Sequence, residues 1–224
     1  MALHISRSTI LWYVVPILAF FIIVIAFFST PLDLSKVSLN YTARPLSPNV
    51  QLQLLPGETY VYEYDLGGKP SNATYSVLGL AGNCMRVSAT ATGEDAPEAA
   101  SICIDLRTGQ AQDSGLTVDF FQPWMLSLHD NFSWGSASRI VYPKPVEMED
   151  VTNVTVTVVG RGTFRGRDAF KVRATSVRVI NGAASDSLEF MLWVDAQKRV
   201  LLASDSPPFH IKLVSAPFEL ANQP

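Results

Sequence analysis

The sequence has few of the residues that metal and catalytic sites use. Among 224 residues there are two cysteines and three histidines, and His4 precedes the first apolar run. His129 and His210 are the histidines left for a folded domain, and two cysteines without a nearby histidine pair do not match the usual sets of metal ligands. We therefore expect no bound metal and no cofactor.

Catalytic motifs are also missing. The sequence has no G-x-S-x-G, Ser-x-x-Lys or H-x-x-x-H pattern, and Gly160-Arg161-Gly162 lacks the lysine of a phosphate-binding loop. Acidic residues cluster at Glu94-Asp95 and between Glu147 and Asp150. A glycosidase needs two carboxylates that converge in space, which neighbouring residues in a turn do not indicate. These absences predict a protein that is not an enzyme.

Long apolar runs are scarce as well, and the sequence contains one, Ile10 to Phe28. This run carries no charge and would rise about 28 Å as a helix, close to the roughly 30 Å hydrocarbon layer of a bilayer. A cleavable signal peptide is the alternative, but its apolar core is usually shorter and ends in small residues, whereas this run ends in Phe27-Phe28. The sequence therefore favours an uncleaved signal-anchor helix.

The anchor divides the chain into four predicted parts. They are a cytoplasmic tail (1–9), a single transmembrane helix (10–28), a stalk containing proline and serine (29–49) and an extracytoplasmic domain (50–224). The tail is too short to fold, so we expect the N-terminus inside the cell membrane and the bulk of the chain outside.

Two further features agree with export. Four of the eight asparagines lie in N-x-Ser/Thr triplets, and we take these as candidate glycosylation sites: Asn40, Asn72, Asn131 and Asn153. Cys84 and Cys103 are equidistant from a turn at Gly93-Glu94, so a hairpin would place them opposite each other. We predict a disulfide, which fits an oxidising compartment; two buried free thiols are the alternative.

Alternation with a period of two dominates the chain after the stalk. Tyr60, Tyr62 and Tyr64 fall on one face of a predicted strand, and similar patterns occur at 154–158, 170–174 and 188–194. Turn signals such as Asn181-Gly182 separate these segments. The pattern predicts a mainly β domain of about ten or eleven antiparallel strands, forming a curved sheet, half-barrel or sandwich.

One segment, 119–134, breaks this alternation. Pro123 can occupy the first turn of a short helix that carries Trp124 inward. The helix would then cap the apolar face of the sheet. The alternative is a surface aromatic patch, including Phe121 and Trp124, that touches the bilayer or a partner subunit.

A basic stretch follows in the chain. Arg161, Arg165, Arg167, Lys171 and Arg173 lie close together in the sequence and, with Phe121 and Trp124, form our candidate interaction surface. Paired strands would align these charges for an anionic lipid, a glycan or an acidic partner. A solvated hairpin face is the alternative. No aromatic pattern in this stretch marks a stacking platform, so a nucleic-acid partner is not expected.

The segment Val156–Leu220 resembles the closing hairpins of the periplasmic lipoprotein-carrier superfamily, which includes an envelope-stress sensor. The resemblance is carried by the Gly162–Val172 strand-and-turn segment and by Leu192-Trp193-Val194-Asp195 followed by Arg199–Ala203. It implies a strongly curved antiparallel sheet, an open half-barrel, with helices over its concave face. The segment near Trp124 would then act as the lid.

These features together predict a single-pass membrane glycoprotein. Its disulfide-bonded β domain, with the candidate glycosylation sites, would lie outside the membrane. Its expected role is that of an accessory or scaffolding subunit of a membrane complex, or of a lipid or glycan binder. A filament or surface-layer subunit, whose apolar helix packs in an assembly core, is the alternative. The partners implied are the membrane and other membrane-complex subunits.

Overall fold

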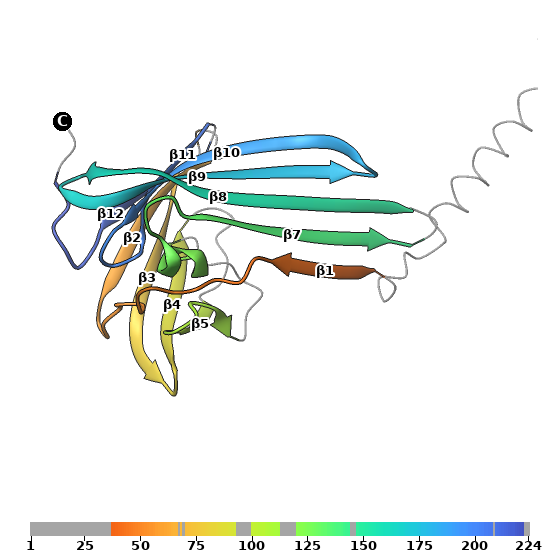
Figure 1. Ribbon diagram of the computed structural model, residues 1–224. Helices are drawn as coiled ribbons and strands as arrows, with labels where there is room; N and C mark the ends of the chain where they lie inside the picture. Colours follow the sequence, from red (N-terminus) through yellow and green to blue (C-terminus); the bar gives the residue numbers. More distant parts are fainter. Residues whose placement is uncertain are drawn as a thin grey trace, which may run out of the picture.

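The structure is a computed structural model that describes residues 37–66, 68, 70–92, 100–112, 120–143, 147–207 and 209–221. Within these ranges twelve strands form one antiparallel sheet in the order β1-β7-β8-β9-β10-β11-β12-β2-β3-β4-β5-β6 (Figure 1). The strands are β1 (Ser38–Ala43), β2 (Thr59–Leu66), β3 (Pro70–Ala81), β4 (Cys84–Thr92), β5 (Ala100–Asp105), β6 (Ala111–Gln112), β7 (Ser133–Tyr142), β8 (Met148–Phe164), β9 (Arg167–Ile180), β10 (Ala183–Asp195), β11 (Leu201–Ser206) and β12 (Phe209–Ser215).

Hairpins build the sheet in two runs, and one long-range pairing joins them. Strands β7 to β12 follow one another in space as in sequence, and so do β2 to β6. The last strand, β12, pairs with β2 and closes the two runs into a single sheet. The expectation of a mainly β, antiparallel fold is confirmed. In the described ranges no helix is long and apolar enough to span a membrane, and the predicted anchor 10–28 lies outside them.

The tyrosine alternation of β2 is confirmed by burial. Tyr60 and Tyr62 are fully buried and Tyr64 nearly so, whereas Thr59 and Glu63 on the opposite face are exposed. Burying a row of aromatic rings on one face of a strand fixes its register, because a slip of one residue would expose every ring.

A short 3-10 helix, η2 (Pro123–Ser127), fills the concave side of the sheet. Its proline stands in the first turn, as the sequence predicted, and Trp124 and Met125 are buried. The preceding Phe120 has no exposed surface, and its ring centroid lies 4.6 Å from that of Tyr75 and 5.8 Å from that of Tyr60. The interpretation of this segment as a cap on the apolar face is therefore confirmed in its geometry.

Beyond this core the sheet continues as an uncovered extension. We call it the arm; it comprises β1 and residues 136–142, 148–155, 175–180 and 183–190 of β7 to β10, and the rest of the described chain is the body. Figure 1 shows β1 and β7 to β10 extending away from the curled part of the sheet. Asp150 is the only buried residue among the described residues of the arm, and no apolar side chain there is buried.

Strand β1 lies where the sequence predicted a stalk. Ser38–Ala43 falls within the range 29–49, yet it pairs with β7 over its whole length. All six of its residues are exposed, so backbone hydrogen bonds rather than side-chain burial define this strand. Leu46, further along the predicted stalk, packs against the core, as does Val50, the first residue of the predicted domain. The linker interpretation of this part of the chain therefore needs correction.

Cys84 and Cys103 form a disulfide between β4 and β5, with Cα atoms 5.5 Å apart. The predicted register needs one correction, because the two cysteines are not directly opposite. Cys84 pairs with Asp105 and Cys103 pairs with Arg86. Diagonal residues on one face of an antiparallel pair remain within reach of each other, and the Cα separation lies in the normal disulfide range.

Glu58 ties the entrance of β2 to the β10–β11 turn. Its carboxylate accepts hydrogen bonds from Lys198 Nζ at 2.6 Å and from the Tyr60 hydroxyl at 2.9 Å. Burial works to raise the pKa of Glu58, but the bonds from Lys198, the Leu55 backbone and Tyr60 outweigh it, so the pKa lies below its ordinary 4.5.

We predict that Glu58 contributes to stability above its unfolded pKa and that this contribution is lost as the pH falls through its lowered folded pKa. Between about pH 5 and pH 3, the free energy of unfolding should therefore fall less steeply in Glu58→Gln than in the wild type. Urea unfolding of the full chain in detergent at several pH values measures this. Glu63→Gln, on the exposed side of β2, is the control and should keep the wild-type slope.

The hydroxyl of Tyr62 should also contribute measurably to stability. It is buried and donates to the carbonyl oxygen of Leu201 at 2.6 Å, linking β2 to β11. Tyr62→Phe should lower the free energy of unfolding by about 1–2 kcal/mol, since a buried acceptor loses its donor. Tyr41→Phe, at an exposed position, should change it by less than about 0.5 kcal/mol in the same urea titration.

Candidate functional site

The two histidines of the described ranges contact different groups. His129 Nδ1 contacts the backbone oxygen of Asp130 at 2.7 Å, while the Asp130 carboxylate accepts from Arg161 Nε instead. His210 pairs with Asp205 at 2.8 Å on the solvent side of β11 and β12. Across the described ranges there is no cluster of three or more His, Cys, Asp or Glu side chains placed to hold a metal ion.

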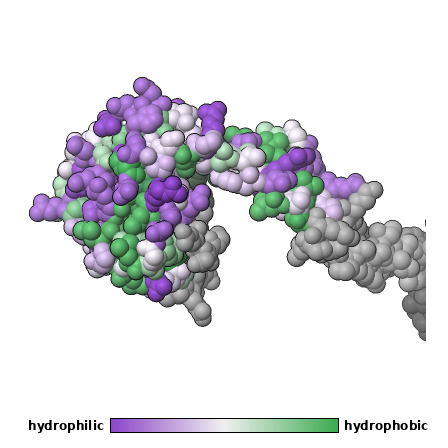
Figure 2. Space-filling model, turned by 60° about the horizontal axis from the view of Figure 1, so that its bottom comes forward, coloured by the Kyte–Doolittle hydropathy of each residue, from purple (hydrophilic) through white to green (hydrophobic). Residues whose placement is uncertain are grey.

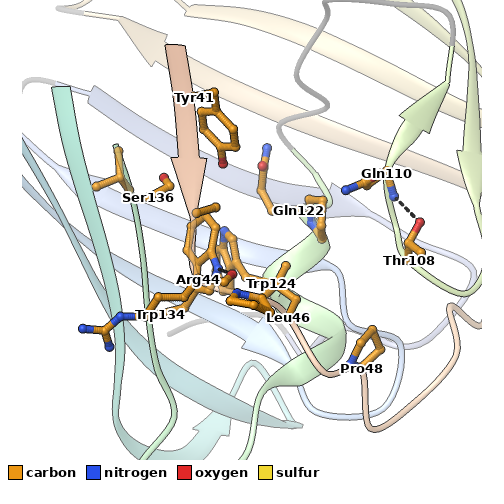
Figure 3. Close-up of a pocket in the computed structure, with 14 residues that line it drawn as sticks. Tyr41, Arg44, Leu46, Pro48, Thr108, Gln110, Gln122, Trp124, Trp134 and Ser136 are labelled. Atoms are coloured by element: carbon orange, nitrogen blue, oxygen red, sulfur yellow. Dashed lines mark hydrogen bonds between the residues drawn. The ribbon is translucent and has the colours of Figure 1, made fainter. Parts of the chain in front are cut away.

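A cleft of about 550 Å³ lies in the angle between arm and body (Figure 3). Figure 2 shows the arm projecting from the rounded body with a hollow beside it. The arm supplies one wall of the cleft, the chain after β1 a second, and η2 with the β5–β6 turn a third. The lining residues are Tyr41, Ala43, Arg44, Pro45, Leu46, Pro48, Thr108, Gln110, Gln122, Pro123, Trp124, Trp134, Ser136 and Val154.

Two sets of hydrogen bonds hold the segment after β1 across the floor of the cleft. The indole N–H of Trp134 donates to the Arg44 carbonyl at 2.8 Å. Further on, the Asn49 backbone N–H donates to Leu126 at 3.0 Å, and its side-chain amide donates to Leu128 at 3.1 Å. These contacts turn the chain from β1 toward η2 and so keep the cleft open between them.

The cleft presents aromatic and neutral polar groups. Tyr41 is 64 % exposed and stands at its arm side, while Trp124 and Trp134 contribute the edges of largely buried rings. Arg44 is the one charged residue of the lining, but it pairs with Gly135 and its side chain therefore lies on the opposite face of the sheet from Tyr41. An uncharged occupant suits such a surface.

The two faces of the arm differ in chemistry. Directly paired residues of an antiparallel sheet share a face, so the register assigns each side chain. The inner face, which continues the cleft, carries Leu39, Tyr41, Ala43, Ser136, Ser138, Ile140, Tyr142, Met148, Asp150, Thr152, Val154, Ser176, Arg178, Ile180, Ala183, Asp186, Leu188 and Phe190. The outer face carries Ser38, Asn40, Thr42, Ala137, Arg139, Val141, Glu149, Val151, Asn153, Thr155, Thr175, Val177, Val179, Ala184, Ser187 and Glu189.

An ion pair occupies the middle of the inner face. Arg178 contacts both carboxylate oxygens of Asp150, with Nη2 2.6 Å from Oδ2 and Nε 3.1 Å from each oxygen. The hydrogen bonds from Arg178 lower the pKa of Asp150 below its ordinary value, and Asp150 in turn raises that of Arg178. Asp150 is therefore buried without being left unpaired.

All four candidate glycosylation sites are exposed: Asn40, Asn72, Asn131 and Asn153. Asn40 and Asn153 both lie on the outer face, next to β7 on either side. Asn153 shares its face with Thr155, as the alternation predicted. Whether glycans are attached stays a prediction, and none of these side chains belongs to the inner face.

The basic residues of the predicted interaction surface do not form one stripe. Arg161 pairs with Asp130, Arg167 with Asp195 and Arg173 with Glu189. The guanidinium of Arg165 binds the carbonyl oxygens of Leu213 and Ala221, and Lys171 lies over the ring of Trp193. Most of this charge is thus locally compensated.

The two aromatic residues of that predicted surface are separated from its arginines by burial. Phe121 is 1 % exposed and Trp124 is 6 % exposed, and both belong to the core under the sheet. Trp124 nevertheless contributes to the lining of the cleft. The residue that the sequence reasoning missed is Tyr41, although Leu39 and Tyr41 alternate with Asn40 and Thr42 in the pattern of a strand.

No protein-family profile matches the sequence, and no curated protein matches it. Two solved structures are similar to this chain. One, from Bacteroides fragilis NCTC 9343, is described as a candidate exported protein with a YmcC-like fold; it has a TM-score of 0.45 and 10% identity, and the match covers 75% of this chain and 99% of that one. The other, from Parabacteroides distasonis ATCC 8503, is described as a candidate lipoprotein, with a TM-score of 0.43, 10% identity and coverage of 74% and 97%. Similarity of this degree assigns no function.

We predict that Trp134→Phe loosens β1 without unfolding the body. The variant keeps an aromatic ring, smaller than the indole, but loses the 2.8 Å bond to the Arg44 carbonyl, which holds the end of β1. Amide exchange at Asn40 and Thr42 should become faster by about tenfold, as expected for loss of one hydrogen bond. Trp193→Phe, whose ring stacks on Phe164 far from β1, is the matched control and should leave these two amides unchanged.

Proposed function

We propose that this protein is a membrane-anchored, extracytoplasmic binding module that acts as an accessory or scaffolding subunit, with the inner face of the arm as its docking surface. The observation that carries the proposal is the arm itself. It extends a well-packed domain by a sheet that buries no apolar side chain among its described residues. Such a sheet gains little from its own folding, and exposed apolar patches of this kind mark sites of association.

Three features support the inner face over the outer face. Leu39, Tyr41 and Leu188 are 67 %, 64 % and 45 % exposed, and all three lie on the inner face. The outer face carries Asn40 and Asn153, where glycans would obstruct a partner. The inner face also continues into the cleft, so that an occupant of one can reach the other.

The proposed location rests on sequence and disulfide together. The apolar run 10–28 supports a single membrane anchor with the domain outside, and the Cys84–Cys103 bond supports an oxidising compartment. A curved sheet with a helical segment on its concave side supports kinship with the lipoprotein-carrier superfamily. Because the concave side is filled by η2 and Phe120, we place binding at the cleft and arm instead.

Binding of a small neutral ligand is the second candidate function, and the shape and lining of the cleft favour it. Its volume of about 550 Å³ lies in the range of ligand sites, and its aromatic and amide lining suits a glycan or the polar end of a lipid. In either case no residue of the cleft is proposed to carry out a reaction.

Substitution on the inner face should release the partner. We predict that Leu188→Glu in the full-length protein reduces by at least about tenfold the amount of any stable companion recovered from native membranes in mild detergent, because a charge would be buried at the interface. Val159→Glu is the matched control: Val159 is 43 % exposed, close to the 45 % of Leu188, and lies outside the arm. Equal recovery with both variants would contradict the proposal.

A further inference from the structure

We infer that the free edge of β1 receives an extended polypeptide segment from a partner protein, which adds a strand to the sheet and places side chains in the adjoining cleft. This inference rests on the proposed scaffolding function and names the form of the partner. It is built on the register of β1, on the composition of its edge and on the position of the cleft.

The register shows which backbone groups of β1 are available. Arg44 N–H donates to the Gly135 carbonyl at 3.0 Å, so these two residues form a hydrogen-bonded pair. In an antiparallel pair such residues alternate, so Thr42 and Asn40 also direct their N–H and C=O groups toward β7. The backbone groups of Leu39, Tyr41 and Ala43 therefore point away from β7.

The bond from Val158 to Phe132 gives the same result from the far side of β7. It makes Phe132 and Val158 a hydrogen-bonded pair, so the even-numbered residues of β7 direct their backbone N–H and C=O groups toward β8. The odd-numbered residues, including Gly135 and Ala137, then direct their backbone N–H and C=O groups toward β1. Among the described residues, no partner is found for the outward N–H and C=O groups of β1.

The edge of β1 also lacks the protection that exposed strands usually carry. Ser38–Ala43 contains no charged residue and no proline, and its pairing with β7 shows no bulge. Leu39 and Tyr41 are strongly exposed. Strand β1 thus presents an unprotected edge that is open for pairing.

The cleft lies where the added strand would need side-chain pockets. Tyr41 and Ala43 project from β1 onto the face that lines it, and Gln122 and Trp124 line it from the body (Figure 3). In strand addition the backbone bonds supply affinity, and pockets for alternate side chains supply specificity. The neutral, aromatic lining selects uncharged or aromatic side chains at those positions.

A second copy of this chain fits the edge less well than a partner segment. Two β1 strands paired antiparallel about a two-fold axis would direct their Ser38 ends in opposite directions. Each Ser38 follows the predicted membrane helix after a link of residues 29–37, which spans at most about 30 Å. The two links would then have to reach the bilayer from opposite ends of the strand pair. A strand from another protein carries no such constraint.

The experiment uses the full-length protein in its native membranes. A photoreactive benzoylphenylalanine replaces Tyr41, and in a control it replaces Leu80, which is equally exposed at 64 % but lies on β3 of the body. After irradiation the adduct is mapped by mass spectrometry, and the crosslinked segment is synthesised as a peptide. We expect an adduct at Tyr41 to one extended segment of another protein, absent at Leu80.

The peptide is then titrated into purified full-length protein in detergent. Leu39→Pro removes an outward N–H without touching the bonds to β7, whereas Leu39→Ala keeps that N–H and removes the side chain. We expect Leu39→Pro to weaken peptide binding at least tenfold and Leu39→Ala to weaken it less than threefold. Peptide binding should slow amide exchange at Tyr41 and Ala43; protected amides at Asn40 and Thr42 in the free Leu39→Pro variant verify that β1 is still formed.

Three results would overturn the inference: an adduct to a second copy of this chain, Tyr41 adducts no more frequent than those at Leu80, or equal peptide binding by Leu39→Pro and the wild type. Its failure is separable from that of the proposed function. If Leu188→Glu releases a companion while Tyr41 gives no adduct, the scaffolding function stands and edge pairing is wrong. If Leu188→Glu releases no companion and Tyr41 gives no adduct, the scaffolding function and edge pairing are both wrong.

Discussion

The packing of the segment around Phe120 and η2 against the tyrosine face of β2 and β3 is the contact on which the rest of this structure depends. Without that segment, the rings of Tyr60, Tyr62 and Tyr75 would face water on an open curved sheet. The same segment determines where the core stops, because β7 begins six residues after η2 and runs away from it. The part of the sheet that packs against η2 forms the body. The part that does not is the arm, which is held by backbone pairing and a few ion pairs.

That division explains why the sequence predicted the body better than the arm. In β2 a period of two coincides with burial, so the Tyr60–Tyr64 pattern identified both the strand and its inner face. In β10 the same pattern runs from Leu188 to Val194 and these residues do share a face, but Val194 is buried and Leu188 is 45 % exposed. Periodicity reports which side chains lie together. It does not report whether anything covers them.

The disulfide Cys84–Cys103 is confirmed. The corrections at β1, to the register of the cysteine pair and to the arrangement of the basic residues have a common physical origin. Each depends on which strands meet, and local sequence carries little information on long-range pairing. β1 pairs with a strand about one hundred residues away along the chain. The cysteine register depends on the β4–β5 connection, and Arg161 and Arg173 find acidic partners on other segments. The cleft was not predictable for the same reason: its walls come from β1, the β5–β6 turn, η2 and β7, and only the folded sheet brings them together.

The pairing of Asp150 with Arg178 makes the inner face suitable for being covered. Removing a lone charge from water costs far more than a typical interface contact returns, so an unpaired Arg178 would oppose docking. Its bidentate interaction with Asp150 already satisfies the hydrogen-bonding capacity of that carboxylate, whose side chain is 9 % exposed, before any partner binds. A partner then needs to cover a guanidinium that is already compensated, between apolar residues nearer the body and nearer the tip. Apart from the exposed carboxylate of Asp186, which lies opposite Arg178 on the same face, the surface is thus ready for an uncharged partner. The outer face, with its exposed ion pairs and asparagines, is suited to remain in water.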